Sequence, residues 1–177
     1  MLLCVIHGPV AQLVARFVRN EEVTGSIPVR STLSSEAGEM RILRLIARLS
    51  LGIALVYAGI GHLTFSRIEF QAQVPVWLPL DPDFVVVASG IVEILLGIGI
   101  ASAGALVPWA GLAAALFFIA IFPGNINQYV EGISAFGLDT DEARFTRLFF
   151  QPLLVVWALW STGAIRYVRE ILRSRNT

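Results

Sequence analysis

The chain has 177 residues, of which 56% are hydrophobic and only 15% are charged, and its 13 basic and 13 acidic residues give a net charge of zero. Average soluble domains carry about 25% charged residues, so this composition is typical of a membrane protein whose partner is the lipid bilayer. Every basic residue is arginine and no basic run is present, so we expect no nucleic-acid partner. The single cysteine, Cys4, excludes a disulfide framework and a CxxC redox pair.

The first 39 residues differ in character from the rest of the chain. The sequence GSIPV at residues 25–29 is what the T-arm of a transfer RNA gene encodes when it is translated, and residues 8–32 resemble such a spurious reading frame. Residues 1–39 are therefore expected to be a non-native or disordered extension, with Met40 as the true start. The alternative is a signal peptide or an amphipathic anchor, but polar residues interrupt the apolar core that a signal peptide needs.

The first apolar run after Met40 is residues 45–63, which is long enough to span a bilayer. Arg48 interrupts it near its start, where a long side chain can reach the headgroup region. A run of similar length, residues 148–165, lies near the end of the chain.

The most informative feature lies between these two runs. From Phe84 to Phe122 the chain runs 39 residues with one charge, Glu93. A single helix of that length would measure about 58 Å, whereas the hydrocarbon core of a bilayer is ~30 Å thick. We therefore expect two spans, residues 84–103 and 106–122, joined by a tight turn.

Together these runs predict an all-α fold, an integral membrane four-helix bundle formed by residues 40–177. With four spans, both ends of the chain lie on one side of the membrane. That side holds seven arginines and the other side three, so the positive-inside rule predicts that both ends are cytoplasmic. The seven are Arg41, Arg44, Arg48, Arg166, Arg169, Arg173 and Arg175, and the three are Arg67, Arg144 and Arg147.

Helical spacing predicts which way the polar residues of the spans point. Gly90, Glu93 and Gly97 share one face with other small residues, and such stripes lie at helix–helix contacts. Glu93 therefore faces protein near the bilayer midplane, where an ionisable group is a candidate functional site. The alternative is a carboxyl group that only holds helices together. His62 lies at the outer end of a similar face in the first span, either as a ligand or as an interfacial residue.

Three more polar residues lie at the outer ends of their spans. Pro123 is expected to end the third span, and Asn125 and Asn127 are then candidates either for a site or for capping the free backbone groups. Gln151 is a further candidate, with the alternative role of bonding carbonyl groups freed by the proline that follows it. If the helices pack as a bundle, these residues can converge with Glu93 and His62 on a cavity in the outer half.

Several kinds of chemistry are excluded by what the spans lack. One histidine within the spans argues against bis-histidine haem ligation. His62 and Glu93 are too few ligands for zinc, so no metal site is expected. No dinucleotide, phosphate-binding or nucleophile–base motif is present, so we expect no catalytic constellation and no cofactor within the chain itself.

Four motifs follow one another along the chain: GIGHLTF at residues 59–65, VPVWLP at 74–79, SGIVEILLG at 89–97 and FPGNIN at 122–127. In this order they resemble the DoxX-like membrane proteins of the DoxX/MauE redox-associated group, over about residues 41–169. The resemblance implies a multi-pass protein of the bacterial inner (plasma) membrane. Some relatives are linked to quinone-coupled sulfur oxidation and others to oxidoreductase or thiol-stress complexes. Gly124 departs from the pattern, which often has alanine there.

Three functions fit these features. The first is an accessory or ligand-binding membrane subunit of a redox system, in which Glu93 and His62 bind a quinone and a membrane-associated oxidoreductase is the partner. The expected apolar wall is Phe117 and Phe118 together with the tryptophans of the last span. The second is a small transporter or proton-conducting bundle, which requires Glu93 to titrate. The third is a structural membrane protein with no ligand.

Overall fold

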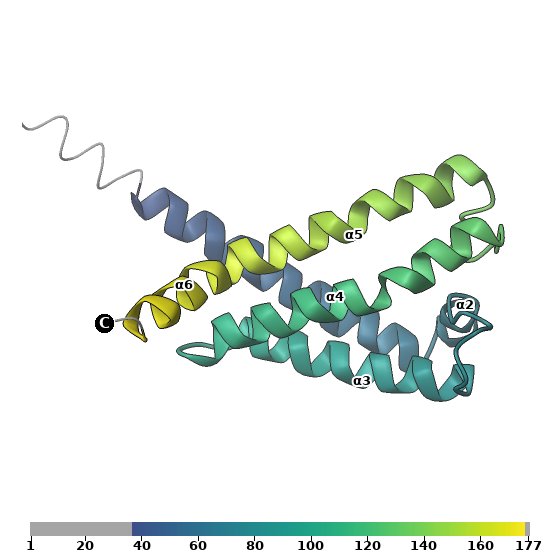
Figure 1. Cartoon of the computed structure of the whole chain (residues 1–177), viewed down its shortest axis with the longest axis horizontal. Coiled ribbons are helices and arrows are strands. Elements are labelled where there is room, and N and C mark those ends of the chain that lie inside the picture. Colours follow the sequence, from purple (N-terminus) through teal and green to yellow (C-terminus); the bar gives the residue numbers. More distant parts are fainter. Residues whose placement is uncertain (1–36, 176–177) are drawn as a thin grey trace, which may run out of the picture. The chain divides into compact units, whose positions relative to one another are not determined.

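The computed structural model describes residues 37–175. In this part of the chain every regular element is a helix, which confirms the all-α prediction. The chain divides into two units, residues 1–43 and 44–177, and all contacts described below lie within the second. The first helix, Ala37–Leu63, is followed by α2 (Arg67–Gln71), α3 (Pro82–Ala101), α4 (Leu106–Val130), α5 (Asp141–Thr162) and α6 (Ala164–Ser174) (Figure 1).

The expectation of a non-native or disordered extension falls mostly on residues 1–36, which lie outside the described residues. The last three residues of the segment 1–39, Ala37–Glu39, are helical. The assignment of Met40 as the true start stays a prediction.

Three helices are long and apolar enough to cross a membrane: the first helix, α3 and α4. The pair α5 and α6 meets the same standard only together, with a bend of 62° between them. The bend lies at Gly163, whose φ of 71° is in the left-handed region that favours glycine. The described residues therefore contain three candidate spans, or four if the bent pair is one span, and the chain is a multi-pass membrane protein.

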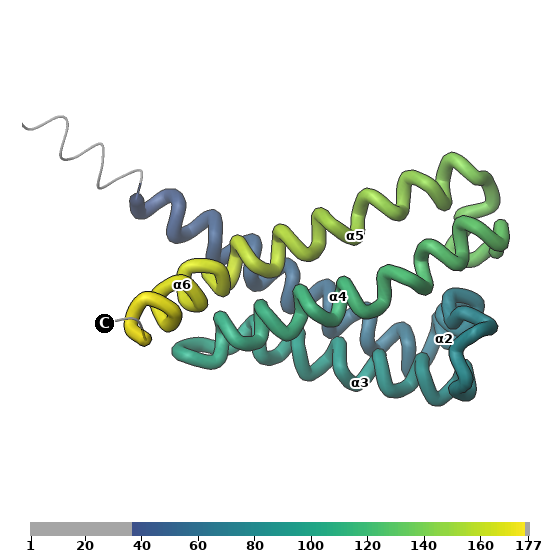
Figure 2. The backbone as a smooth tube through the Cα atoms, in the orientation of Figure 1, coloured from purple at the N-terminus to yellow at the C-terminus, as the bar shows by residue number. Residues whose placement is uncertain are grey.

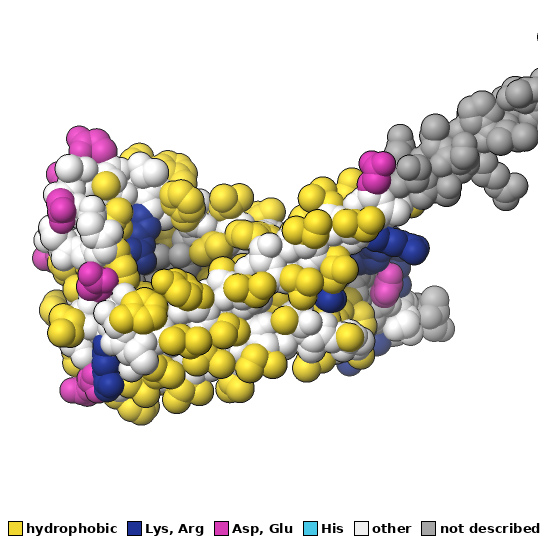
Figure 3. All heavy atoms as spheres, turned by 180° about the vertical axis from the view of Figure 1, so that it is seen from behind, with side chains coloured by type: hydrophobic (Ala, Val, Ile, Leu, Met, Phe, Trp, Pro, Cys, Tyr) yellow, Lys and Arg dark blue, Asp and Glu magenta, His cyan; other side chains and the backbone are white. Residues whose placement is uncertain are grey.

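The surface agrees with this assignment. Figure 3 shows hydrophobic side chains over most of one face, and acidic side chains at the end formed by α2 and the connection between α4 and α5. Many large apolar side chains lie on this surface and are more than half exposed, among them Ile53, Leu95, Leu116 and Val156. In water they would form a large unfavourable apolar surface. Lipid chains would cover them.

The turn between α3 and α4 lies where the long apolar run predicts it, at residues 102–105. The third span, however, does not end at Phe122. Pro123 lies inside α4, and the helix runs on to Val130. A proline removes only one backbone hydrogen bond, and packing against neighbouring helices keeps the rest of α4 helical.

The last long helix also differs from the prediction, because α5 begins at Asp141 instead of near residue 148 and ends at Thr162. Thr140 caps it, since its hydroxyl oxygen accepts a hydrogen bond from the Ala143 amide at 3.2 Å. Two acidic residues in the first turn favour the same start, because they complement the helix dipole.

The small-residue stripe of α3 packs against the first helix, as the spacing predicts. A Cβ atom added at Gly97 would lie 2.6 Å from the carbonyl oxygen of Gly52, and one added at Gly59 would lie 2.5 Å from that of Gly90. The two backbones therefore touch at two levels. This close approach is what turns Glu93, between Gly90 and Gly97, toward protein.

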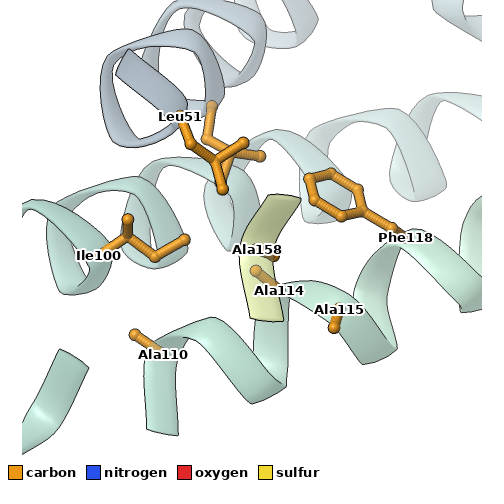
Figure 4. Close-up of a cluster of buried hydrophobic side chains, with 8 residues drawn as sticks. Leu51, Ile100, Ala110, Ala114, Ala115, Phe118 and Ala158 are labelled. Atoms are coloured by element: carbon orange, nitrogen blue, oxygen red, sulfur yellow. The ribbon is translucent and has the colours of Figure 1, made fainter. Parts of the chain in front are cut away.

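The helices α4 and α5 lie side by side along much of their lengths (Figure 2). Alanines make this contact close, and a cluster of buried apolar side chains joins them to the first helix and α3 (Figure 4). We call it the apolar cluster. It consists of Leu51, Leu55, Ile100, Ala110, Ala114, Ala115, Phe118 and Ala158.

Candidate functional site

A cavity of about 600 Å³ lies between the first helix, α3, α4 and α5, and the segment that follows α2 closes part of it. We call it the main cavity. Most of its lining is apolar, with aromatic rings from several elements. Its polar side chains include His62, Gln73, Glu93, Asn125, Arg147 and Gln151.

The central polar contact is between Glu93 and His62. The Nδ1 atom of His62 lies 3.1 Å from Oε2 of Glu93, and the two residues are only 7% and 5% exposed. The same Nδ1 atom lies 2.9 Å from the carbonyl oxygen of Ala58. A carbonyl oxygen only accepts hydrogen bonds, so Nδ1 carries the proton and donates it to Ala58.

The consequence for Glu93 is an unsatisfied carboxylate oxygen. Its Oε2 atom is buried and receives no well-directed hydrogen bond from the described residues, although the imidazole is close. A buried polar atom without a partner destabilises a protein by about 1–3 kcal/mol. Because Glu93 lines the main cavity, its carboxyl group is a candidate partner for a ligand bound there.

Aromatic contacts hold the His62 ring in place. Phe70 stacks on it with ring centroids 3.4 Å apart and planes inclined by 16°. Phe136 in turn meets Phe70 edge-on at 4.6 Å. The imidazole is therefore fixed by Ala58 on its own helix and by rings from α2 and from the connection between α4 and α5, which orients it before any ligand arrives.

Asn125 and Gln151 also line the main cavity, but the described contacts bind them to each other. The Asn125 Nδ2 atom donates to Oε1 of Gln151 at 2.9 Å, and Gln151 Nε2 donates to the Phe118 carbonyl oxygen at 2.6 Å. The suggested capping role of Asn125 is wrong, because α4 continues past it. The suggested role of Gln151 beside Pro152 is also wrong, since its acceptor lies on α4.

Asn127 does not line the main cavity. Because α4 stays helical beyond Pro123, residues 125 and 127 differ by about 200° around the helix axis and face opposite sides. Its predicted role as a helix cap is wrong for the same reason. Asn127 is half-buried, and its Nδ2 atom has no hydrogen-bond partner among the described residues.

Two of the polar residues that line the main cavity, Arg147 and Gln73, are not predicted from the sequence. The predicted fourth span begins after Arg147, whereas this residue lies in α5 one helical turn before Gln151, on the same face. An earlier start for α5, signalled by Thr140 and its acidic neighbours, would have revealed the i, i+4 pair. Gln73 follows α2 in an irregular segment, and no sequence pattern indicated it.

The guanidinium group of Arg147 contacts one side chain that follows α2 and one from the connection between α4 and α5. Its two terminal nitrogens lie 2.7 and 2.8 Å from the side-chain amide of Gln73. A guanidinium only donates hydrogen bonds, so the amide oxygen of Gln73 is the atom that faces it. The group also lies 5.1 Å from the centre of the Phe136 ring.

The aromatic wall differs in part from the prediction. Phe117 and Phe118 line the main cavity, but the tryptophans of α5 do not. Trp157 donates its Nε1–H to the Ala47 carbonyl oxygen at 2.9 Å. Trp160 lies under the guanidinium of Arg44, at 5.7 Å. Both tryptophans therefore contact the first helix instead of lining the main cavity.

Two ion pairs lie at the end of the bundle that carries α2 and the start of α5. Arg67 contacts the Asp83 carboxylate through two nitrogens, and Gln71 donates to the same carboxylate at 2.8 Å. The hydrogen bond to Asp83 raises the pKa of Arg67, against the opposing effect of desolvation. Arg144 donates to Asp141 at 2.7 Å and to the Leu138 carbonyl oxygen at 2.8 Å.

Comparison with known proteins gives one match. No curated protein and no solved structure matches the chain. A family model described as a domain of unknown function, DUF8561, matches residues 51–162. That range contains every polar residue named above as lining the main cavity. The chain therefore belongs to the DUF8561 family.

Proposed function

We propose that this protein is a four-span, DoxX-like protein of the bacterial inner membrane that acts as the ligand-binding, accessory subunit of a redox system. The ligand is a quinone held in the main cavity, and a membrane-associated oxidoreductase is the partner. The observation that carries this proposal is that Glu93 lines a largely apolar cavity and that its buried Oε2 atom receives no well-directed hydrogen bond from the described residues.

The residues present fit a quinone. A flat ring with oxygen atoms on its edge needs apolar and aromatic walls and one or two polar groups. Phe70, Phe117, Phe118 and Phe136 supply rings, and the Glu93 carboxyl, when protonated, can donate a hydrogen bond to a ring oxygen. A bound quinone would supply the electron and proton chemistry of its ring. Glu93 would hold a proton at Oε2, and His62 would keep the carboxyl in position.

The proposed orientation places the main cavity in the outer half of the membrane. In a four-span arrangement in which α5 and α6 form one bent span, seven arginines flank the side that carries both ends of the chain, and three flank the other side. The cytoplasmic leaflet attracts positive charge. His62, Asn125 and Arg147 belong to the opposite, outer end.

The packing favours a binding site over a proton-conducting path. The apolar cluster contains no titratable side chain, and three of its members, Leu51, Leu55 and Phe118, also line the main cavity. Proton transfer through it would need a chain of polar groups or water. A cavity walled in part by such apolar packing suits a bound ligand.

Quinone binding can be measured as a change in thermal stability. We expect a soluble quinone analogue to raise the unfolding temperature of the protein in detergent, because a ligand that binds only the folded state stabilises it. Glu93→Leu should reduce this shift, since a leucine side chain cannot donate a hydrogen bond to a ring oxygen. Arg67→Gln is the matched control, because Arg67 lies outside the cavity lining, and it should keep the full shift.

The absence of any shift at saturating analogue in the wild-type protein would contradict the proposal. So would a proton flux across liposomes carrying the wild-type protein that Glu93→Leu abolishes, because it would favour conduction over binding.

A further inference from the structure

Arg147 is a cation in the wall of the main cavity that no carboxylate of the described residues neutralises. The two other arginines at this end of the bundle are paired, Arg67 with Asp83 and Arg144 with Asp141. The contacts of Arg147 are the neutral amide of Gln73 and the ring of Phe136. Its positive charge is therefore oriented by the protein but not balanced by it.

These contacts fix the guanidinium in a definite direction. Gln73 receives hydrogen bonds from both terminal nitrogens, at 2.7 and 2.8 Å, and Phe136 supports the group from one side. A partly buried cation with apolar neighbours is stabilised when a negative group approaches it. An arginine held in this way is suited to bind an oxyanion, because its planar fork is oriented in advance.

Arg147 also lies where a ligand in the main cavity can reach it. A second cavity, of about 650 Å³, shares with the main cavity the residues Phe136, Arg147, Gln151 and Leu154. Arg147 thus lies at the boundary of the two cavities, one helical turn from Gln151. A molecule whose apolar body fills the main cavity could place a polar end at this boundary.

We propose that Arg147 and Gln73 form a subsite for an anionic oxygen group carried by the ligand. The ligand is then amphipathic, with an apolar ring or chain in the main cavity and one ionised hydroxyl, carboxylate or phosphate group at Arg147. This inference rests on the proposed function only in that it takes the ligand to be the one bound in the main cavity.

Paired probes with the same ring system test the subsite. A hydroxynaphthoquinone with its acidic hydroxyl on the quinone ring is ionised at neutral pH, and its methyl ether is neutral. We expect the wild-type protein in detergent to bind the ionised probe at least about tenfold more tightly, the effect of one charge-assisted hydrogen bond. Arg147→Gln should abolish this preference while leaving the affinity for the methyl ether unchanged. Tryptophan fluorescence or calorimetric titration measures both affinities.

Control variants separate the charge from the shape of the site. Arg67→Gln removes a positive charge at the same end without touching the cavity, and it should keep the preference for the ionised probe. Arg147→Lys keeps the positive charge but loses the planar guanidinium group, and this variant should keep part of the preference for the ionised probe. Unfolding of Arg147→Gln without probe shows whether the variant is folded. If it is not, Gln73→Leu, which should weaken the preference by disorienting the guanidinium, takes its place.

Three results would overturn the subsite. Equal affinity of the wild-type protein for both probes would do so while leaving the proposed function intact, whereas binding of neither probe would contradict the proposed function itself. A phospholipid phosphate could occupy the same guanidinium instead. Anionic lipid that copurifies with the wild-type protein but not with Arg147→Gln, together with unchanged probe affinities, would assign Arg147 to the lipid and overturn the ligand subsite.

Discussion

Gly59→Ala is expected to destabilise the protein although alanine favours helices more than glycine does. Within a helix the propensity gain from glycine to alanine is about 1 kcal/mol. Against it, the new Cβ atom would lie 2.5 Å from the Gly90 carbonyl oxygen and 3.1 Å from the Ile94 amide nitrogen. Both are backbone atoms of α3, so the whole helix would have to move. Overpacking of this kind lowers the free energy of unfolding by about 1–3 kcal/mol, and we expect it to exceed the propensity gain.

The matched control is Gly38→Ala in the same helix. A Cβ atom at Gly38 meets nothing within 4 Å, so only the propensity term acts and the variant should be as stable as the wild-type protein or slightly more so. Thermal unfolding in detergent, followed by circular dichroism, compares the two. If Gly59→Ala unfolds at the same temperature as Gly38→Ala, the close approach of the first helix and α3 is not present in the folded protein.

Gln151→Leu is expected to have the second large effect. Gln151 is buried and connects Asn125 to the Phe118 carbonyl oxygen, so its loss leaves the Asn125 amide without its partner inside the protein. An unpaired buried amide lowers the free energy of unfolding by about 1–3 kcal/mol. The variant should therefore unfold at a lower temperature and in less denaturant than the wild-type protein.

A double-mutant cycle tests whether the pair accounts for the effect. In Asn125→Leu with Gln151→Leu no unpaired side-chain amide remains, and α4 and α5 are joined by apolar groups instead. We expect the double variant to be less destabilised than the sum of the two single variants, with a coupling of roughly 0.5–3 kcal/mol. Strictly additive effects would mean that the two amides do not bond in the folded protein.

The binding and stability variants act on different parts of one cavity. Glu93 and Arg147 each have a polar group that the described contacts leave available, whereas Asn125 and Gln151 satisfy each other. Substitutions at the first pair should therefore change ligand binding more than folding. Substitutions at the second pair should change folding first, and binding only as a consequence.

Three features follow from the amino-acid sequence alone: the helical class, the turn at residues 102–105 and the face of α3 that carries Glu93. The reason is physical: an apolar run longer than a bilayer must fold back, and the 3.6-residue period places Gly90, Glu93 and Gly97 on one side of a helix. It also identified His62 and Glu93 as candidates, because a polar group in an apolar span needs a partner.

Which polar side chains contact one another depends on how the helices pack, and the sequence did not predict it. Pro123 is a helix breaker by propensity, but packing keeps α4 helical to Val130, which turns Asn125 toward the main cavity and Asn127 away from it. The early start of α5 brings Arg147 to the cavity wall, where Gln73 from a distant segment meets it. Propensity and spacing act within one helix, whereas contacts between helices depend on their relative depth and rotation, which the packing of all the helices sets together.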